Sequence, residues 1–142
     1  MAHILRISEA ASIAMHALIL LAENMKEPVS NSRIAEAFSI SANHSSKVMQ
    51  RLLKSGYVNA VRGPGGGYTL AVDPATVTLL DVYITIDGKP STSGCLFGEE
   101  KHCSLPVCLF GRLTYEADGL IEKHLGSVTL ADYMDEDIAL TK

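Results

Sequence analysis

The sequence lacks an apolar run long enough to span a membrane, which takes about 20 residues. The most apolar stretch, residues 1–25, contains Glu9 and His16 and has no small-residue cleavage site after it. We therefore expect a first helix here rather than a signal peptide, and a cytoplasmic protein. The 142 residues, of which 47% are hydrophobic and 20% charged, suffice for one compact soluble domain, or for a small domain with an added oligomerisation element.

Cysteine is also scarce, and its three copies, Cys95, Cys103 and Cys108, all lie in one segment. An odd number of cysteines in a cytoplasmic protein argues against a disulfide framework. Thiolates are the preferred ligands of iron–sulfur clusters, but three of them leave a four-ligand set incomplete. The segment therefore predicts a cluster completed by a carboxylate, by a histidine such as His102 or His3, or by an exogenous ligand. The alternatives are a zinc site that includes His102, or thiols that respond to oxidation without metal.

Acidic residues are scarce between positions 30 and 70, where Glu36 faces five Lys or Arg residues. The net charge is −4 overall. Residues 1–72 carry seven basic and four acidic side chains, or +3, whereas residues 73–142 carry five and twelve, or −7. An acidic protein with one basic section indicates a localised surface for a polyanion.

The first half of the chain has the pattern of a winged helix. Apolar spacing predicts a helix over about 9–25 with Ser8 as its N-cap, followed by two short helices between 30 and 55. Strands are predicted over 57–61 and 68–72, on either side of the glycine-rich loop RGPGGG. This loop has no GK[ST] after it, so it is not the phosphate loop of an ATP enzyme. A hairpin directly after a helix-turn-helix is a wing.

The second half of the chain is less clearly patterned. The stretch 76–87 suits either a strand or a helix capped by Thr78, and the cysteine segment follows it as a long loop. Apolar residues from Leu109 to Leu125 predict a helix that a partner subunit covers, and an acidic, loose tail should begin at Ala131. We thus predict a mainly α fold with a small hairpin, divided into a DNA-binding domain 1–72, a connecting segment with the cysteine loop 73–108, and a dimerisation helix and tail 109–142.

The chain resembles the Rrf-two family of winged-helix transcription regulators. The resemblance rests on ISEAASIAMHALILLA, on IAEAFSISANHSSKVMQRLLKSGYVNAVRGPGGGYTLA and on the three cysteines. It implies a homodimer that binds a palindromic double-stranded operator, and it favours the helical interpretation of residues 79–86. It further implies a repressor, not an enzyme, whose cysteine loop holds an iron–sulfur cluster that senses redox state, nitric oxide or iron–sulfur status. The alternative is a cluster-free or zinc-binding regulator that responds to thiol oxidation, a metabolite or a protein partner.

The predicted DNA contacts come from the start of the recognition helix and from the wing. Asn43 and Ser45 can each donate and accept hydrogen bonds, which suits the reading of base edges in the major groove. Lys47, Arg51 and Arg62 suit phosphate neutralisation. The full predicted set is Ser41, Asn43, His44, Ser45, Ser46, Lys47, Arg51, Arg62, Gly65, Gly66 and Tyr68.

The fourth ligand of the predicted cluster follows from the resemblance. The iron–sulfur assembly regulator of the family has a histidine three residues after its last cysteine, where this chain has Gly111. The nitric-oxide sensor instead uses a carboxylate near the N-terminus of the other subunit, and Glu9 falls at the matching place. The resemblance therefore implies Cys95, Cys103 and Cys108 with Glu9 of the partner subunit as ligands of a 2Fe–2S or 4Fe–4S cluster.

Overall fold

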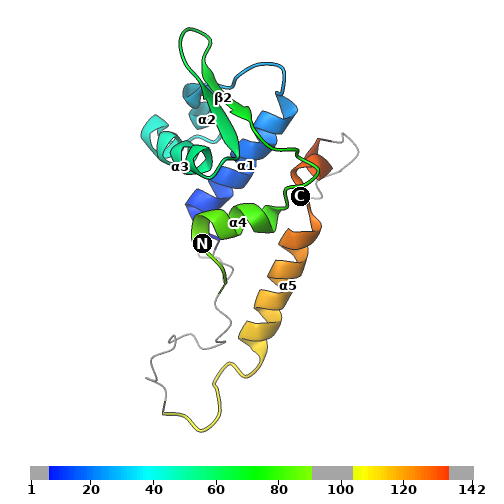
Figure 1. Cartoon of the computed structure of the whole chain (residues 1–142). Helices are drawn as coiled ribbons and strands as arrows, with labels where there is room; N and C mark the ends of the chain where they lie inside the picture. The colour runs from blue at the N-terminus through cyan, green and yellow to red at the C-terminus, as the bar shows by residue number, and fades with distance from the viewer. Residues whose placement is uncertain (1–6, 91–103, 135–142) are drawn as a thin grey trace.

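The computed structural model describes residues 7–90 and 104–134 (Figure 1). Helices predominate in this part of the chain, and its strands form one antiparallel hairpin, which confirms the predicted fold class. None of the helices described is long and apolar enough to cross a membrane. The elements are α1 (Glu9–Glu23), α2 (Asn31–Ala37), α3 (Ala42–Lys54), β1 (Val58–Val61), β2 (Gly67–Leu70), α4 (Leu79–Asp87), α5 (Leu113–Ser127) and the 3-10 helix η1 (Leu130–Tyr133).

Helix α1 forms the centre of the body. Ser8 caps it as predicted, since its side chain accepts a hydrogen bond from the backbone N–H of Ala11 at 3.0 Å. Ala14, Ala17 and Leu18 of α1 have no exposed surface, so the other elements pack around this helix. The helix ends two residues earlier than predicted, at Glu23, and Met25 beyond it is 58% exposed rather than part of the apolar face.

Helices α2 and α3 form the predicted helix-turn-helix. Ser30 and Ser41 cap the two helices, and Ser39 between them adopts a left-handed φ of 53° to make the turn. Ile34 of α2 and Leu52 of α3 are fully buried, so the pair shares the core that surrounds α1. This packing leaves the opposite surface of α3 exposed.

The hairpin after α3 is the predicted wing, with Val58 paired to Leu70 and Val61 paired to Gly67. Val29 joins the other edge of β2 through two backbone hydrogen bonds of 2.9 Å with Tyr68. A Cβ atom on Gly67 would lie 2.3 Å from the carbonyl oxygen of Val29, so only glycine permits this close approach. The wing is therefore fixed to the body at its base, while its tip extends beyond the body (Figure 1).

Residues 79–87 form a helix and not a strand. Leu79, Val82 and Ile86 are buried at helical spacing, and α4 packs on α1. Thr78 and Asp81 form a capping box, in which the side chain of each residue accepts a hydrogen bond from the backbone N–H of the other. The β-branched residues of this stretch suit a strand as well as a helix, and the cap and the single buried face favour the helix.

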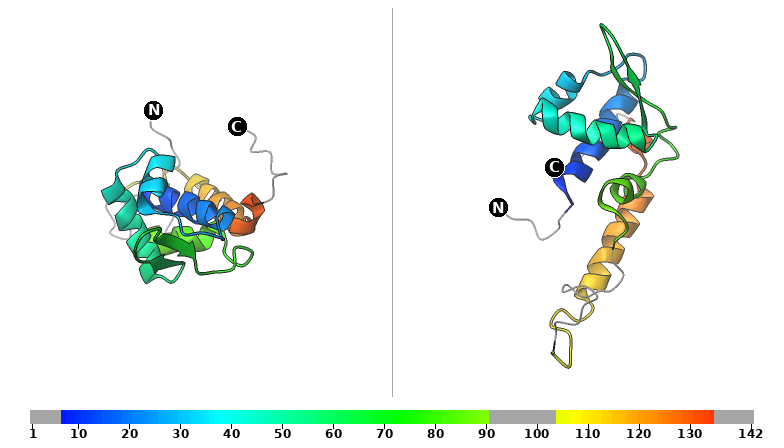
Figure 2. Two further views of the ribbon diagram at one scale, coloured as in Figure 1. Left: turned by 90° about the horizontal axis from the view of Figure 1, so that it is seen from above. Right: turned by 60° about the vertical axis from the view of Figure 1, so that its left-hand side comes forward.

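Helix α5 extends away from the body, on the side opposite to the wing tip (Figures 1 and 2). It begins at Leu113, four residues later than predicted, and Leu125 near its end is its one buried residue. Leu125 and Leu130 join the core of the winged helix, so residues on both sides of position 72 share one core. Residues 131–133 belong to η1 rather than to a loose tail, because Leu130 anchors that turn.

Candidate DNA interface and cysteine site

The exposed surface of α3 carries a row of polar side chains. Asn43, Lys47, Gln50 and Lys54 are exposed at helical spacing along it, and His44 and Ser46 are half-buried beside them. Asn and Gln side chains pair with adenine edges, and lysine neutralises phosphate. Gln50 and Lys54 were not among the predicted contacts, although their spacing from Asn43 and Lys47 places them in the same row.

Ser41 begins α3 as a cap. Its side chain accepts a hydrogen bond from the backbone N–H of His44 at 3.0 Å. This bond satisfies one of the donors that every helix start leaves open. The residue therefore supports the recognition helix through its own main chain, and its hydroxyl keeps its hydrogen and a second lone pair for another partner.

Ser45 does not lie on the outer surface of α3. It has no exposed surface, and its Oγ has no hydrogen-bond partner within the structure. The predicted role of Ser45 as a base-reading residue does not fit this placement, because the side chain points into the body. Its place in the sequence, two residues after Asn43, puts it on the opposite face of a helix.

The wing tip exposes Arg62 and Gly65. Gly66 shapes the loop, since a Cβ atom there would lie 2.3 Å from the carbonyl oxygen of Val61. Tyr68, predicted to flank the groove, is only 9% exposed and packs in the core. The wing therefore offers Arg62 and its backbone to a ligand, and Tyr68 anchors the hairpin instead.

Arg51 is exposed but already engaged. One of its guanidinium nitrogens donates a hydrogen bond to the main-chain carbonyl of Ile86 in α4. The other donors of the guanidinium remain available, because arginine carries five. Arg51 therefore lies at the edge of the polar row, between the exposed surface of α3 and α4.

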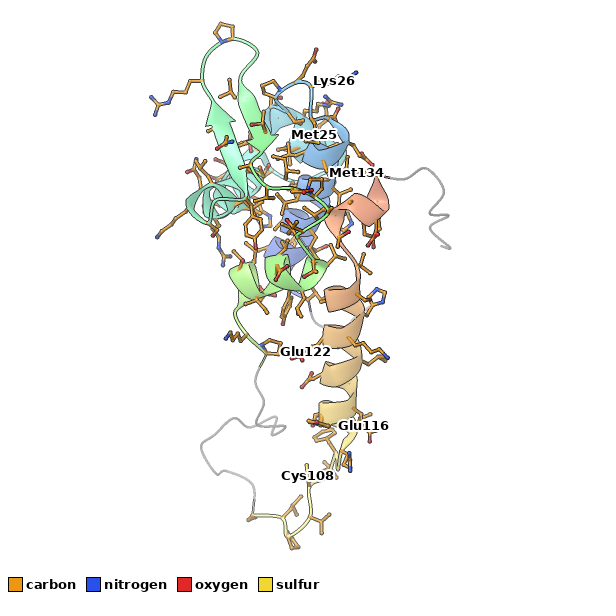
Figure 3. The ribbon with its side chains drawn as sticks, turned by 45° about the vertical axis from the view of Figure 1, so that its right-hand side comes forward. Met25, Lys26, Cys108, Glu116, Glu122 and Met134 are labelled. Atoms are coloured by element: carbon orange, nitrogen blue, oxygen red, sulfur yellow. The ribbon has the colours of Figure 1, made fainter. Side chains whose placement is uncertain are left out.

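The predicted cluster ligands are only partly visible. Cys95 and Cys103 lie outside the described residues. Cys108 is an exposed free thiol at the outer end of α5, far from the body (Figure 3). Glu9 is exposed and opens α1 within the body. Among the residues that the structure describes, no three His, Cys, Asp or Glu side chains gather into a metal site.

A winged helix with an exposed polar recognition helix defines a regulator of transcription. The chain belongs to the Rrf2 family, described as iron-dependent transcriptional regulators, whose model matches residues 7–136. This is the Rrf-two family that the sequence resembles, so the family predicted from the sequence is confirmed. The relatives found are transcription regulators and not enzymes.

Similar proteins agree on this class. The chain is 32% identical over 133 residues to the HTH-type transcriptional regulator NsrR of Bacillus licheniformis, covering 92% of this chain and 85% of that protein. It is 40% identical over 78 residues to the putative HTH-type transcriptional regulator BadM of Rhodopseudomonas palustris, covering 55% of this chain and half of that protein. The solved structure of CymR, the global cysteine regulator of B. subtilis, superposes with a TM-score of 0.74 at 26% identity, covering 92% of this chain and 97% of that one.

Proposed function

We propose that this protein is a homodimeric, cytoplasmic repressor that binds a palindromic operator and responds to a signal at its cysteine segment. Residues 1–72 bind DNA, residues 73–108 connect and sense, and residues 109–142 pair the subunits. The observation that carries the proposal is the exposed polar row of α3 beside a wing with an exposed Arg62, on a chain of this family.

The contacts proposed for DNA are residues of α3 and the wing that the structure leaves exposed or half-buried, with Ser41 at the start of α3 among them. Asn43 and Gln50 read base edges in the major groove, with His44 and Ser46 beside them. Lys47, Lys54 and Arg62 neutralise phosphates, and the backbone of Gly65 and Gly66 lets the wing approach the sugar-phosphate chain closely. Arg51 joins the phosphate contacts with its remaining donors.

The surface proposed for pairing is the outer face of α5. Leu113 and Leu120 are 62% and 71% exposed, one above the other on a helix that extends from the body. Apolar residues repeated on one exposed helix face are typical of a subunit interface. Pairing through α5 also places two winged helices on one duplex, as a palindrome requires.

The cysteine segment is proposed to hold an iron–sulfur cluster. The family description includes iron dependence, and Cys108 offers an unpaired, exposed thiol. Cys95, Cys103 and Cys108 would supply three thiolates, and a bound cluster would supply redox and ligand-exchange chemistry. Glu9 opens α1 in the body, and Cys108 precedes the outer end of α5 (Figure 3), so the fourth ligand in this proposal is Glu9 of the partner subunit.

Anaerobic purification followed by iron and sulfide analysis tests the cluster. We expect a coloured protein, loss of iron in Cys103→Ala, and full iron in the neighbouring control Ser104→Ala. Glu9→Ala should change the visible spectrum. Colourless wild-type protein with bound zinc would support the zinc-binding alternative, and protein without metal would support the thiol-based one.

Binding of wild-type protein to labelled promoter fragments tests the DNA function. We expect Asn43→Ala to weaken binding selectively for the operator, by about 1–3 kcal/mol. Lys47→Gln should weaken binding to all sequences alike. Equal behaviour of wild-type protein and both variants on every fragment would contradict the proposed interface.

A further inference from the structure

The last three residues of α4 contact three separate parts of the winged helix. We call these residues and their partners the α4 joint. They bring together segments that lie between 28 and 79 residues apart in the sequence. The pairs are Asp87 with Ser8, Ile86 with Arg51, and Thr85 with Tyr57.

Asp87 fixes the end of α4 to the start of α1. Its carboxylate accepts hydrogen bonds from the backbone N–H of Ser8 at 3.2 Å and from the Ser8 hydroxyl at 2.5 Å. That hydroxyl in turn accepts from the N–H of Ala11 as the cap of α1. A carboxylate at a helix N-terminus is also favoured by the helix dipole. One side chain therefore stabilises the position of the central helix of the body.

Arg51 fixes the recognition helix to the same point. Its guanidinium donates to the carbonyl of Ile86. Ile86 lies in the last turn of α4, which ends at Asp87, and the carbonyls of a last helical turn have no N–H partner within the helix. Arg51 supplies the missing donor, and its positive charge lies at the negative end of α4. The Tyr57 hydroxyl, 3.3 Å from Oγ1 of Thr85, adds a third attachment just after α3.

We propose that the α4 joint positions the recognition helix for DNA, with Asp87 as a positioning residue and Arg51 as the link. The proposal rests on the proposed DNA-binding function. Asp87 is negatively charged and thus unsuited to contact with phosphate, so it acts through α4 and α1. Without the joint, α3 would keep its core packing through Met49 and Leu52 but would lose its hydrogen bond to α4.

Replacing Asp87 gives a test in which the loss of charge and the loss of positioning change DNA affinity in opposite directions. Removal of a negative charge alone should strengthen binding to DNA slightly. Loss of positioning should weaken it. We expect Asp87→Ala to bind a labelled operator fragment about 3- to 10-fold more weakly. The matched control Asp118→Ala, which removes the same charge from α5, should bind as tightly as wild type or slightly tighter. Equal affinities for the two variants would overturn the proposal.

A double-mutant cycle tests whether Asp87 acts through Arg51, which it does not touch. In the Arg51→Gln background, Asp87→Ala should change DNA affinity less than about twofold, because the link is already absent. Independent effects, with the same fold-change in both backgrounds, would contradict the joint. Tyr57→Phe removes a single hydroxyl and serves as the milder variant; we expect a loss of about twofold.

Hydrogen exchange in the DNA-free protein separates the failure of this inference from the failure of the proposed function. The backbone amides of α3 should exchange faster in Asp87→Ala than in Asp118→Ala, with far-ultraviolet circular dichroism unchanged. Wild-type protein that binds no duplex would refute the DNA function, while exchange still tests the joint. Unchanged exchange in α3 would refute the joint, whatever the protein binds.

Discussion

Gly67 is the residue at which the wing meets the body. It opens β2, and the position of its missing Cβ lies 2.3 Å from the carbonyl oxygen of Val29 and 2.7 Å from the backbone nitrogen of Ser30. We expect Gly67→Ala to lower the free energy of unfolding by about 2 kcal/mol, because the contact is with backbone and not with a movable side chain. Urea unfolding measures this. Gly119→Ala, in open space on α5, should leave stability unchanged or raise it.

Ser45 gives a second prediction at the same scale. Its buried Oγ lacks a partner within the structure, so the hydroxyl destabilises the fold without a compensating hydrogen bond. We expect Ser45→Ala to raise the free energy of unfolding by about 1 kcal/mol and to leave DNA affinity unchanged. The same pair of measurements on Asn43→Ala should show the reverse, with stability kept and affinity lost. Weakened DNA binding in Ser45→Ala would restore Ser45 to the interface.

Tyr83 should make the protein less stable at high pH. Burial, and to a lesser extent the nearby carboxylates of Asp87 and Asp118, raise the pKa of Tyr83. Because the pKa of Tyr83 is raised in the folded state, its contribution to the free energy of unfolding is complete below the pKa of the unfolded state, about 10. This contribution is lost as the pH rises through the pKa of the folded state. Thermal unfolding of wild-type protein should therefore shift downward above about pH 10 more steeply than that of Tyr83→Phe. The exposed Tyr115→Phe should follow wild type.

Residue types predicted the interface only in part. Asn43 and Lys47 were identified because their chemistry suits bases and phosphates, and both are exposed. Ser45 and Tyr68 have suitable chemistry as well, but burial depends on which side of α3 and β2 meets the core. The engagement of Arg51 could not be predicted, because its partner is a main-chain carbonyl 35 residues away.

At the scale of elements, sequence signals predicted where helices start better than where they end. Ser8 and Thr78 were identified as caps, and both accept the expected backbone hydrogen bonds. Helix α5 begins later than its apolar stripe because Gly111, with a φ of 54°, bends the chain first. Periodicity reports a shared face, but it does not say whether residues 109–112 are already helical.

The exposed face of α5 gives a prediction about this element. We expect Leu120→Gln to raise the dissociation constant of the dimer at least about tenfold, because an apolar side chain at the centre of an interface is lost. Glu122→Gln places the same residue on the opposite side of α5 and should leave association unchanged. Sedimentation velocity across a concentration series measures both. A monomeric wild-type protein would contradict pairing through α5.

For the whole molecule, the uneven distribution of charge sets how binding depends on salt. The net charge is −4, yet Lys47, Lys54 and Arg62 are exposed near one another in sequence within the winged helix. Together with the remaining donors of Arg51, a dimer would thus neutralise about eight phosphates, which predicts a slope of roughly −7 in a plot of log affinity against log salt concentration. Lys54→Gln, which removes two charges from the dimer, should reduce the slope by about 2. A slope near zero would contradict binding through phosphates.

The bond from Arg51 to α4 also affects how sequences related to this one should vary. Its acceptor is a carbonyl of the main chain, which every amino acid possesses, so the side chain at position 86 is free to change among apolar types without loss of the bond. A survey of many relatives would then find no correlated substitution between positions 51 and 86. Methods that infer spatial proximity from paired substitutions would overlook the attachment.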